Sequence, residues 1–341
     1  MFATRAARLL TRSRIKDALR RDLAKHGFAE VDVPALQVSP GNETHIAAFA
    51  TEMLGPDGQA RRMFLHTSPE FSCKKLLAAG MPRLFAFGPV FRNRERGRLH
   101  HPEFTMLEWY RAQASLDAAI ADCVRLLTVA AATAGATEFR HRDTIADPFA
   151  PPELLTVSDA FRRHAALDLE PLLPGAPDAR ARFADAVDAR GVRVSDDDTW
   201  SDLFSKLLTA RVEPELGQRR ATVLTHYPAS EAALARLCPA DPRFALRFEL
   251  YCCGVELANG FAELTDAVEQ RCRFGEAERE RERIYGERYP LDDDFLAALE
   301  GMPDSCGVAL GFDRLVMLAT GADTIADVLW LPVADPEARP A

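Results

Sequence analysis

Several features that define large classes of protein are missing from this sequence of 341 residues. No segment approaches the roughly 20 consecutive apolar residues that a membrane-spanning helix needs, because the alanine-rich run after Arg125 is too short. The seven cysteines are scattered and show no CxxC or Cys/His spacing of the zinc-binding type. We therefore expect reduced thiols in a cytoplasmic protein that does not enter a membrane.

An excess of positive charge is also absent. The net charge of −9 repels a phosphate backbone, so nucleic-acid binding would have to depend on a local basic patch. The segment before Asp17 is basic, but it lacks the apolar core of a secretory signal, and we expect it to lead into an amphipathic helix. A hydrophobic content of 48% is enough for a sizeable core, in one large α+β domain or two average ones.

The spacing of apolar residues predicts both helices and strands, with no internal repeat. Helices are expected at 14–26, 71–79, 112–135 and, with a solvated face of alternating acids and bases, at 269–289. Strands are expected at 30–36, 63–67, 84–91, 103–110, 221–226, 244–255 and 325–331, and a strand followed by a helix at 307–321. Between about 140 and 215 the composition shifts toward Ala, Asp, Pro and Arg, which predicts a helical insertion.

The most informative passage is the segment from Phe91 to Arg111, which reads FRNRERGRLHHPEFTMLEWYR. The end of an apolar strand, an arginine-rich loop and a second strand with acids among aromatics follow one another, as in a hairpin that holds an anion beside a cation. A nucleotide next to an amine is such a combination. Arg92 stands at the strand end, where its guanidinium could grip an α-phosphate. The alternative for Arg92 alone is an ordinary surface salt bridge.

Three glutamates, Glu249, Glu256 and Glu263, are spaced seven residues apart. This spacing could form one stripe of a helix, but the surrounding β-rich sequence favours strands. Buried acids near a phosphate site require compensating cations. The acids therefore predict a site that binds metal ions or amines.

Three separated segments together resemble the class II aminoacyl-tRNA synthetases. The passage at 91–111 resembles motif 2, GVALGFDRLVML resembles motif 3, and the first helix with VDVP resembles motif 1. TSPE, HHPEFTMLEWY and ELANGFAELTDA resemble the lysyl branch of that class. The resemblance implies a single α+β catalytic domain over residues 1–341, with an antiparallel β-sheet flanked by helices, the insertion at 140–215, ATP and Mg²⁺ as cofactors, and a homodimer formed through motif 1.

The resemblance also implies roles for individual residues. Arg92 and Arg314 would be the catalytic arginines, on the α-phosphate and the far phosphates respectively, while Glu249 and Glu256 would hold Mg²⁺. The rest of the ATP site would comprise Asn93, Arg94, His101, Leu257 and Gly311, together with Glu256. The amino-acid site would comprise Ser68, Pro69, Glu70, Glu108, Tyr110, Asn259, Glu263 and Ala309. Taken singly, each acid could instead cap a helix or form a salt bridge, and Glu70 near a helix start is favourable anyway.

Two departures from the family pattern affect the nucleotide site. The motif FRNE is FRNR here, so Arg94 replaces an acid that contacts adenine, and Glu95 follows one place later. Either the adenine contact moves to the backbone or to Glu95, or ATP binds slightly differently. HNPEF is HHPEF, which puts His101 at a nucleotide-contacting position, where an imidazole can hydrogen-bond or stack. His100 could be a structural histidine.

Two further departures bear on the acceptor. The motif 1 helix is expected to begin by about Arg14, which leaves no room for the OB-fold anticodon-binding domain of lysyl-tRNA synthetases. Ala309 stands where those enzymes have glycine, so a methyl group intrudes on the amino-acid pocket. Both features resemble the elongation factor P (R)-β-lysine ligases, a family of truncated paralogues.

This narrower resemblance implies ATP-dependent activation of (R)-β-lysine and its transfer to a lysine ε-amino group of elongation factor P, with no tRNA. Two alternatives remain: a minimal lysyl-tRNA synthetase-like enzyme that acts on tRNA, and a non-catalytic regulatory paralogue. No basic face supports the first. Retention of the two arginines and the two metal-binding glutamates argues against the second.

Overall fold

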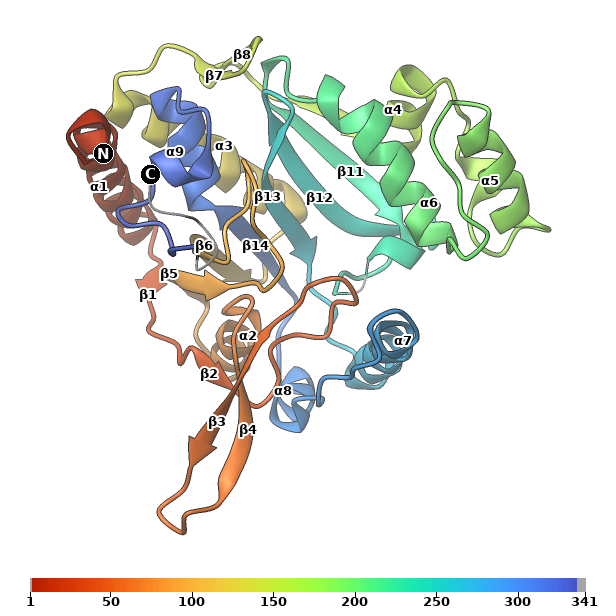
Figure 1. Cartoon of the computed structure of the whole chain (residues 1–341), viewed down its shortest axis with the longest axis horizontal. Coiled ribbons are helices and arrows are strands. Elements are labelled where there is room, and N and C mark those ends of the chain that lie inside the picture. The colour runs from red at the N-terminus through yellow and green to blue at the C-terminus, as the bar shows by residue number, and fades with distance from the viewer. Residues whose placement is uncertain (1, 233, 336–341) are drawn as a thin grey trace.

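The computed structural model describes residues 2–232 and 234–335, and its centre is an eight-stranded β-sheet (Figure 1). In spatial order the strands are β1 (Ala29–Glu30), β5 (Arg83–Phe91), β6 (Glu103–Ala112), β14 (Ser305–Gly311), β13 (Val255–Ala262), β12 (Phe244–Cys252), β11 (Thr222–Pro228) and β9 (Glu153–Thr156). The edge pairs β1 with β5 and β9 with β11 are parallel, and the inner pairs are antiparallel. This architecture confirms the expected α+β fold.

Three helices pack on one face of the sheet: α1 (Phe2–Lys25), α3 (Leu116–Ala134) and α9 (Phe312–Thr320) (Figure 1). In α1 the apolar residues Ile15, Leu19 and Leu23 recur every four positions, and all three are fully buried. They share a core with alternate residues of β6, including Leu107 and Trp109. The main core therefore lies between these helices and the sheet.

Two helix boundaries differ from the sequence-based prediction. The first helix begins at Phe2 rather than near Arg14, and its early turns contact the end of the chain, because Arg5 Nη1 donates to the carbonyl oxygens of Ala326 and Leu329. The helix expected at 112–135 begins at Leu116, since β6 runs on to Ala112 and the Ser115 side chain caps the helix. Both helix boundaries are set by tertiary contacts, which local helix propensity does not reflect.

Most of the other predicted elements are confirmed. The strands expected at 84–91, 103–110 and 221–226 are β5, β6 and β11, and the motif 3 segment forms β14 followed by α9. The helices expected at 71–79 and 269–289 are α2 (Glu70–Ala78) and α7 (Ala267–Tyr285), and α8 (Asp293–Leu299) packs beside them. The charged helix α7 is not solvated all round, since it buries Phe274 and Arg281.

The strand predicted at 30–36 is wrong over most of its length. Only its first residue belongs to β1, while Val31 and Val33 pack against the cluster of apolar side chains around α2 and α8. The alternation of apolar residues there reflects packing rather than a hydrogen-bonded ladder. The segment predicted as a closing strand at 325–331 is also wrong, because Ile325–Asp327 form a 3₁₀ turn capped by Thr324.

The long β-rich stretch expected at 244–255 contains β12 and the first residue of β13, which are joined by a tight turn. Cys253 and Gly254 have φ values of 54° and 69°, so the chain reverses between β12 and β13. The turn was missed because cysteine is not a usual turn residue. The consequence is a longer antiparallel hairpin, in which LANGFA belongs to a strand.

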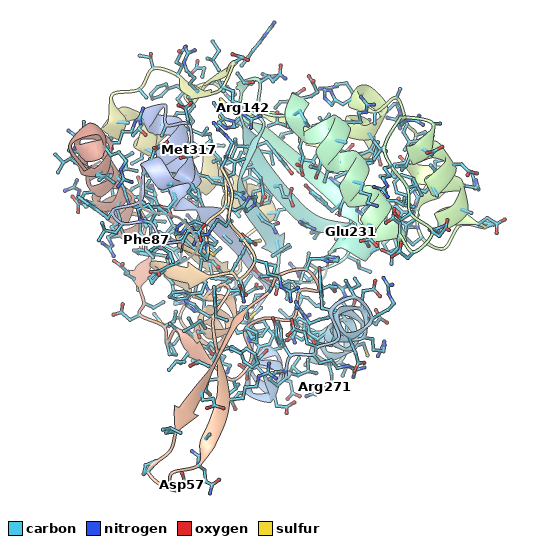
Figure 2. All side chains as sticks on the ribbon, in the orientation of Figure 1. Asp57, Phe87, Arg142, Glu231, Arg271 and Met317 are labelled. Atoms are coloured by element: carbon cyan, nitrogen blue, oxygen red, sulfur yellow. The ribbon has the colours of Figure 1, made fainter. Side chains whose placement is uncertain are left out.

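A second hairpin was only partly predicted. The strand expected at 63–67 is the end of β4 (Ala60–Leu65), which pairs with β3 (Phe49–Leu54) and β2 (Leu36–Gln37) in a separate small sheet. Figure 2 shows Asp57 at the tip of this hairpin, far from the body of the molecule. Most side chains of β3 are exposed, so the apolar alternation of a half-buried strand is absent from its sequence.

The range 140–215 contains strands as well as helices. Its first part forms β7 (Phe139–His141), β8 (Thr144–Asp147) and β9, and β8 pairs with β10 (Arg219–Arg220). Its second part forms α4 (Val157–His164), α5 (Ala179–Asp188), α6 (Trp200–Leu207) and the short turns Glu170–Leu172, Leu208–Val212 and Glu213–Glu215. These helices bury their own aromatic core against β11 and β12. The insertion therefore extends the sheet and covers its far end (Figure 1).

Two observations concern composition. All seven cysteines have free thiols, and six of them are buried, where a thiol packs like a small apolar side chain. Among the residues that the structure describes, no helix combines the length and the apolar composition that crossing a membrane requires.

A buried ion pair joins the three segments that resemble the family motifs. Arg12 of α1 binds the carboxylate of Asp313, and both side chains are almost fully buried. Arg12 Nη2 also donates to Thr105 Oγ1 at 2.8 Å, and Thr105 N donates to Asp313 at 2.6 Å. Because an unpaired buried charge is costly, this triad fixes α1, β6 and α9 relative to one another.

We expect Arg12→Met to lower the free energy of unfolding by about 3 kcal/mol, because it leaves the Asp313 carboxylate buried without a counter-ion. The measurement is urea denaturation followed by circular dichroism. The control Arg21→Met removes an exposed ion pair with Asp17 on the same helix and should change stability by less than about 0.5 kcal/mol. Equal losses in the two variants would contradict the importance of the buried pair.

Candidate functional site

A cavity of about 380 Å³ lies on the face of the sheet opposite α1, α3 and α9. Side chains alternate along a strand, so β6 sends Leu107 and Trp109 into the main core while Met106, Glu108 and Tyr110 point the other way. The cavity wall combines motif 2, the β12–β13 hairpin, β14 and the start of α9. The sheet thus gathers segments far apart in sequence around one space.

Arg92 stands at one side of this cavity, immediately after β5. Its Nε donates to Thr67 O at 3.3 Å, and its guanidinium lies 5.3 Å from the centre of the Phe104 ring. Among the described residues, no partner binds its two Nη atoms. The guanidinium is therefore held in place from behind and can offer two donors to an anion in the cavity.

Arg314 stands in the first turn of α9 and is held from several sides. It donates to the carbonyl oxygens of Leu99 and Glu256, at 3.2 and 2.9 Å, and its Nη1 lies 3.3 Å from the Glu256 carboxylate. Its Nη2 lies 2.9 Å from His100 Nε2. Burial and the nearby Arg314 lower the pKa of His100, so the neutral imidazole can accept this hydrogen bond. His100, which we considered as a structural histidine, is thus a partner of Arg314.

The altered residue of motif 2, Arg94, has a left-handed backbone conformation, with φ of 65°. Its side chain is exposed, and the guanidinium lies 5.2 Å from the centre of the Tyr285 ring on α7. Arg94 is not one of the residues that line the cavity, whereas Glu95 is. Asn93 supports the turn, because its Oδ1 accepts from Arg94 N at 2.8 Å. The geometry therefore favours Glu95 or the backbone over the Arg94 side chain for the adenine contact.

His101 lines the cavity and is almost fully buried. Its Nδ1 lies 2.6 Å from Glu103 O, and Val333 N donates to its Nε2 at 3.2 Å. Both ring nitrogens are thus engaged by the backbone. For this imidazole we considered a hydrogen bond to a nucleotide or stacking against it. Because both nitrogens are engaged, stacking or another contact through the ring carbons remains open.

Glu249 and Glu256 both line the cavity, on neighbouring strands β12 and β13. Glu249 accepts from the hydroxyl groups of Tyr227 and Tyr251, each at 2.6 Å, and forms an ion pair with Arg247. Burial raises the pKa of Glu249, the Arg247 guanidinium opposes this, and the nearby Glu256 adds to the rise. The two carboxylates therefore lie close enough to repel each other, as expected of groups that share a cation.

The donor set fits Mg²⁺ bound together with phosphate. Among the residues that the structure describes, no cluster of three or more His, Cys, Asp or Glu side chains is arranged to hold a metal ion. Magnesium, however, commonly takes only one or two protein carboxylates and completes its shell with water and substrate phosphates. Glu249 and Glu256 match that pattern and do not match an all-protein metal site.

At the other end of the cavity, Glu108 forms a buried group with Ser68 and Tyr110. Ser68 Oγ donates to Glu108 at 2.7 Å, and the Tyr110 hydroxyl donates to the other carboxylate oxygen. Burial, and then the negative charge of Glu70, raise the pKa of Glu108 to about 8. A bound cation would reverse that effect, so this carboxyl group suits an ammonium ligand.

Glu70 and Glu263, also predicted for the amine site, are joined by a lysine that the sequence reading missed. Lys74 Nζ lies 2.5 Å from Glu70 and 2.6 Å from Glu263, and all three side chains are buried. Burial lowers the pKa of Lys74, but the attraction of Glu263 and Glu70 outweighs it and the pKa is raised overall. Burial raises the pKa of Glu263 to about 7, which Lys74 opposes.

The remaining wall of this pocket is formed by small and polar residues. Ala309 lies opposite Glu108 on one neighbouring strand and opposite Asn259 on the other. Gly307 allows Glu263 and Tyr110 to approach, because a Cβ at that position would overlap both.

Of the predicted substrate residues, Ser68, Glu70, Asn259 and Ala309 line the cavity, while Glu108, Tyr110 and Glu263 lie behind that wall. Pro69 is the residue before α2. Leu257 and Gly311, predicted for ATP, line the cavity as well.

Several charged residues that form pairs at the site or line its cavity were not predicted. Arg247 pairs with Glu249, Lys74 pairs with two acids, and Glu43 and Glu231 line the cavity. The spacing of Lys74, four positions after Glu70 on one helix, was the signal that could have revealed its ion pair. Glu43 lies in a loop and Glu231 ends a short 3₁₀ turn, and no local pattern links either residue to the site.

Comparison with known proteins identifies the family of this chain. The family model described as tRNA synthetases class II (D, K and N) matches residues 3–335. The chain is 40% identical over 323 residues to an elongation factor P–(R)-β-lysine ligase from Klebsiella pneumoniae (strain 342), covering 94% of this chain and 93% of that protein. It is 39% identical over 329 residues to the protein of the same name from Proteus mirabilis (strain HI4320), covering 96% and 95%. The chain therefore belongs to the class II (D, K and N) tRNA synthetase family, in the branch of the elongation factor P–(R)-β-lysine ligases.

Proposed function

We propose that this protein is an ATP-dependent ligase that activates (R)-β-lysine as an adenylate and transfers it to the ε-amino group of a lysine on elongation factor P. The observation that carries the proposal is the division of one cavity into two ends of opposite charge. Arg92 and Arg314 stand at one end, and Glu70, with Glu108 and Glu263 behind it, stands at the other. A phosphate chain and a diamino acid fit these ends.

In the first step the substrate carboxylate attacks the α-phosphorus of ATP, and pyrophosphate leaves. Arg92 would hold the α-phosphate and take up the charge that develops on it, and Arg314 would hold the far phosphates. The acidic end would hold the two ammonium groups, which fixes the carboxylate toward Arg92. When Mg²⁺ is bound by Glu249 and Glu256, it would neutralise phosphate charge and help pyrophosphate to leave.

In the second step the acceptor amine opens the mixed anhydride, and AMP leaves. The net charge of −9 favours a protein acceptor over tRNA, because a polyanion would be repelled. We also propose that the chain works as a homodimer in the cytoplasm, through the segment that resembles motif 1. Apolar side chains exposed beside that segment, Leu36 and Val38, suit a subunit contact.

Purified protein with Mg·ATP and (R)-β-lysine should add one β-lysyl group to elongation factor P. Mass spectrometry of the intact acceptor, and of its peptides, checks both the added mass and the modified lysine. An acceptor of unchanged mass, with an enzyme that exchanges pyrophosphate into ATP, would contradict this function. Saturable charging of tRNA with lysine would instead support the alternative acceptor.

Arg92→Ala should reduce adenylate formation by at least 100-fold, because no other donor replaces a guanidinium that stabilises the transition state. The assay is pyrophosphate exchange with (R)-β-lysine. Arg61→Ala is a matched control, since this arginine pairs with Asp57 on the exposed hairpin and should leave exchange unchanged. A loss of less than tenfold in Arg92→Ala would remove this residue from the catalytic step.

Ala309→Gly should improve the use of α-lysine relative to β-lysine, because it removes a methyl group from the pocket wall. One methyl group is worth about 1–3 kcal/mol, so the ratio of kcat/KM values should change by about 5- to 150-fold. Ala258→Gly is the control, because this buried alanine on β13 lies in the main core and does not line the cavity. An isomer preference that stays the same in Ala309→Gly would exclude the residue as a determinant of specificity.

A further inference from the structure

Glu43 is an acid of the cavity wall that neither the phosphate site nor the amine site uses. It lies in the loop between β2 and β3, and its side chain is partly buried. The loop is fixed to α7, because Arg281 donates to the carbonyl oxygens of Glu43 and Ile46, and Asn42 donates to Glu278 at 2.8 Å. The position of Glu43 is therefore set by buried contacts, although the residue belongs to a loop.

The carboxylate of Glu43 is free to act, unlike most acids around the cavity. Ion pairs engage four of them, Glu70 with Lys74, Glu249 with Arg247, Glu256 with Arg314 and Asp313 with Arg12, and Glu231 accepts from Ser201. Among the described residues, no ion pair and no hydrogen bond from another side chain reaches the Glu43 carboxylate. Glu95 is the other acid without such a bond, and it lies beside His100 at the nucleotide end.

Glu43 lines the same cavity as Glu70 at the amine end and Arg92 at the phosphate end. Glu70 acts on it electrostatically from the amine end and Arg92 from the phosphate end, and Arg281 of α7 is the third charged neighbour. Burial, and then the charge of Glu70, raise the pKa of Glu43, while its own backbone N–H and the two arginines oppose the rise. A substrate held by Glu70 and Arg92 would place its activated carbonyl carbon near this carboxylate.

We propose that Glu43 is the general base of the transfer step, the group that takes a proton from the ε-ammonium of the acceptor lysine. The amine nitrogen then attacks the carbonyl carbon of the adenylate, and the bond from that carbon to the phosphate oxygen breaks. AMP leaves with the electron pair, and the second proton of the amine passes to solvent through the open cavity. This role rests on the proposed function, since it requires an amine acceptor.

The test separates the two half-reactions in Glu43→Gln. We expect transfer from preformed adenylate to elongation factor P to slow by about 100-fold in single-turnover measurements, a typical contribution of general base catalysis. The KM for (R)-β-lysine in pyrophosphate exchange should stay within about twofold. Hydroxylamine, which is already unprotonated at neutral pH, should capture the adenylate at the wild-type rate. Glu52→Gln, on the exposed hairpin of the same segment, is the control and should match wild type throughout.

The pH dependence provides a second readout. Transfer by the wild type should fall as the pH drops through the pKa of Glu43, whereas Glu43→Gln should lose that acid limb and rise only as the acceptor amine loses its own proton. Glu43→Asp should recover part of the rate. Unchanged transfer in Glu43→Gln, or an equal loss in exchange, transfer and hydroxylamine capture, would overturn the proposal. A wild-type enzyme that exchanges pyrophosphate but never modifies elongation factor P would instead contradict the proposed function itself.

Discussion

The buried ammonium of Lys74, between Glu70 and Glu263, is the interaction on which the acidic end of the cavity depends. Three carboxyl groups, those two and Glu108, lie together where water is largely excluded, and one internal cation cannot neutralise them all. The excess negative charge is relieved by protonation of Glu108, because burial and the charge of Glu70 raise the pKa of Glu108 to about 8. Binding an ammonium group would release that proton. The pocket therefore lacks positive charge, which a diamino acid supplies.

The opposite end of the cavity, in contrast, lacks negative charge. Arg314 has a carboxylate beside it, whereas within the part of the chain that the structure describes the Arg92 guanidinium is held by a backbone carbonyl and an aromatic ring alone. A phosphate would complete it without displacing an internal partner. Because the strands fix both ends, the charge separation would orient the proposed substrate before any chemistry occurs. Orientation here is a property of the sheet, whose alternating side chains put the core on one face and the charged cavity on the other.

The sequence predicted those parts of the site that lie on regular elements. Arg92, Glu108 and the strand and helix of motif 3 occur in long apolar patterns, which predicted their elements, while the resemblance to the synthetase family implied that they share one site. Lys74 lies four positions after Glu70 and Arg247 two positions before Glu249, but their roles were not assigned, because charged residues so close in sequence are usually exposed. Burial of such pairs becomes visible only when the fold brings them together. The turn at Cys253 was missed because cysteine is not a usual turn residue, and the hairpin at 49–65 was only partly predicted because its exposed strand 49–54 lacks apolar alternation.

A lysine acceptor, in place of a tRNA, requires the removal of a proton, and the fold shared with the synthetases does not by itself provide a group for that. A tRNA offers a hydroxyl group, which is neutral at physiological pH, whereas a lysine side chain holds its extra proton up to a pH of about 10. An amine that arrives as ammonium cannot attack a carbonyl carbon until that proton leaves. An enzyme that acylates lysine therefore needs a proton acceptor near the anhydride, and the acids that we propose for metal or amine binding are already engaged by other groups. Glu43 meets the requirement because it lines the cavity together with Glu70 and Arg92, and among the described residues no ion pair or side-chain hydrogen bond engages its carboxylate.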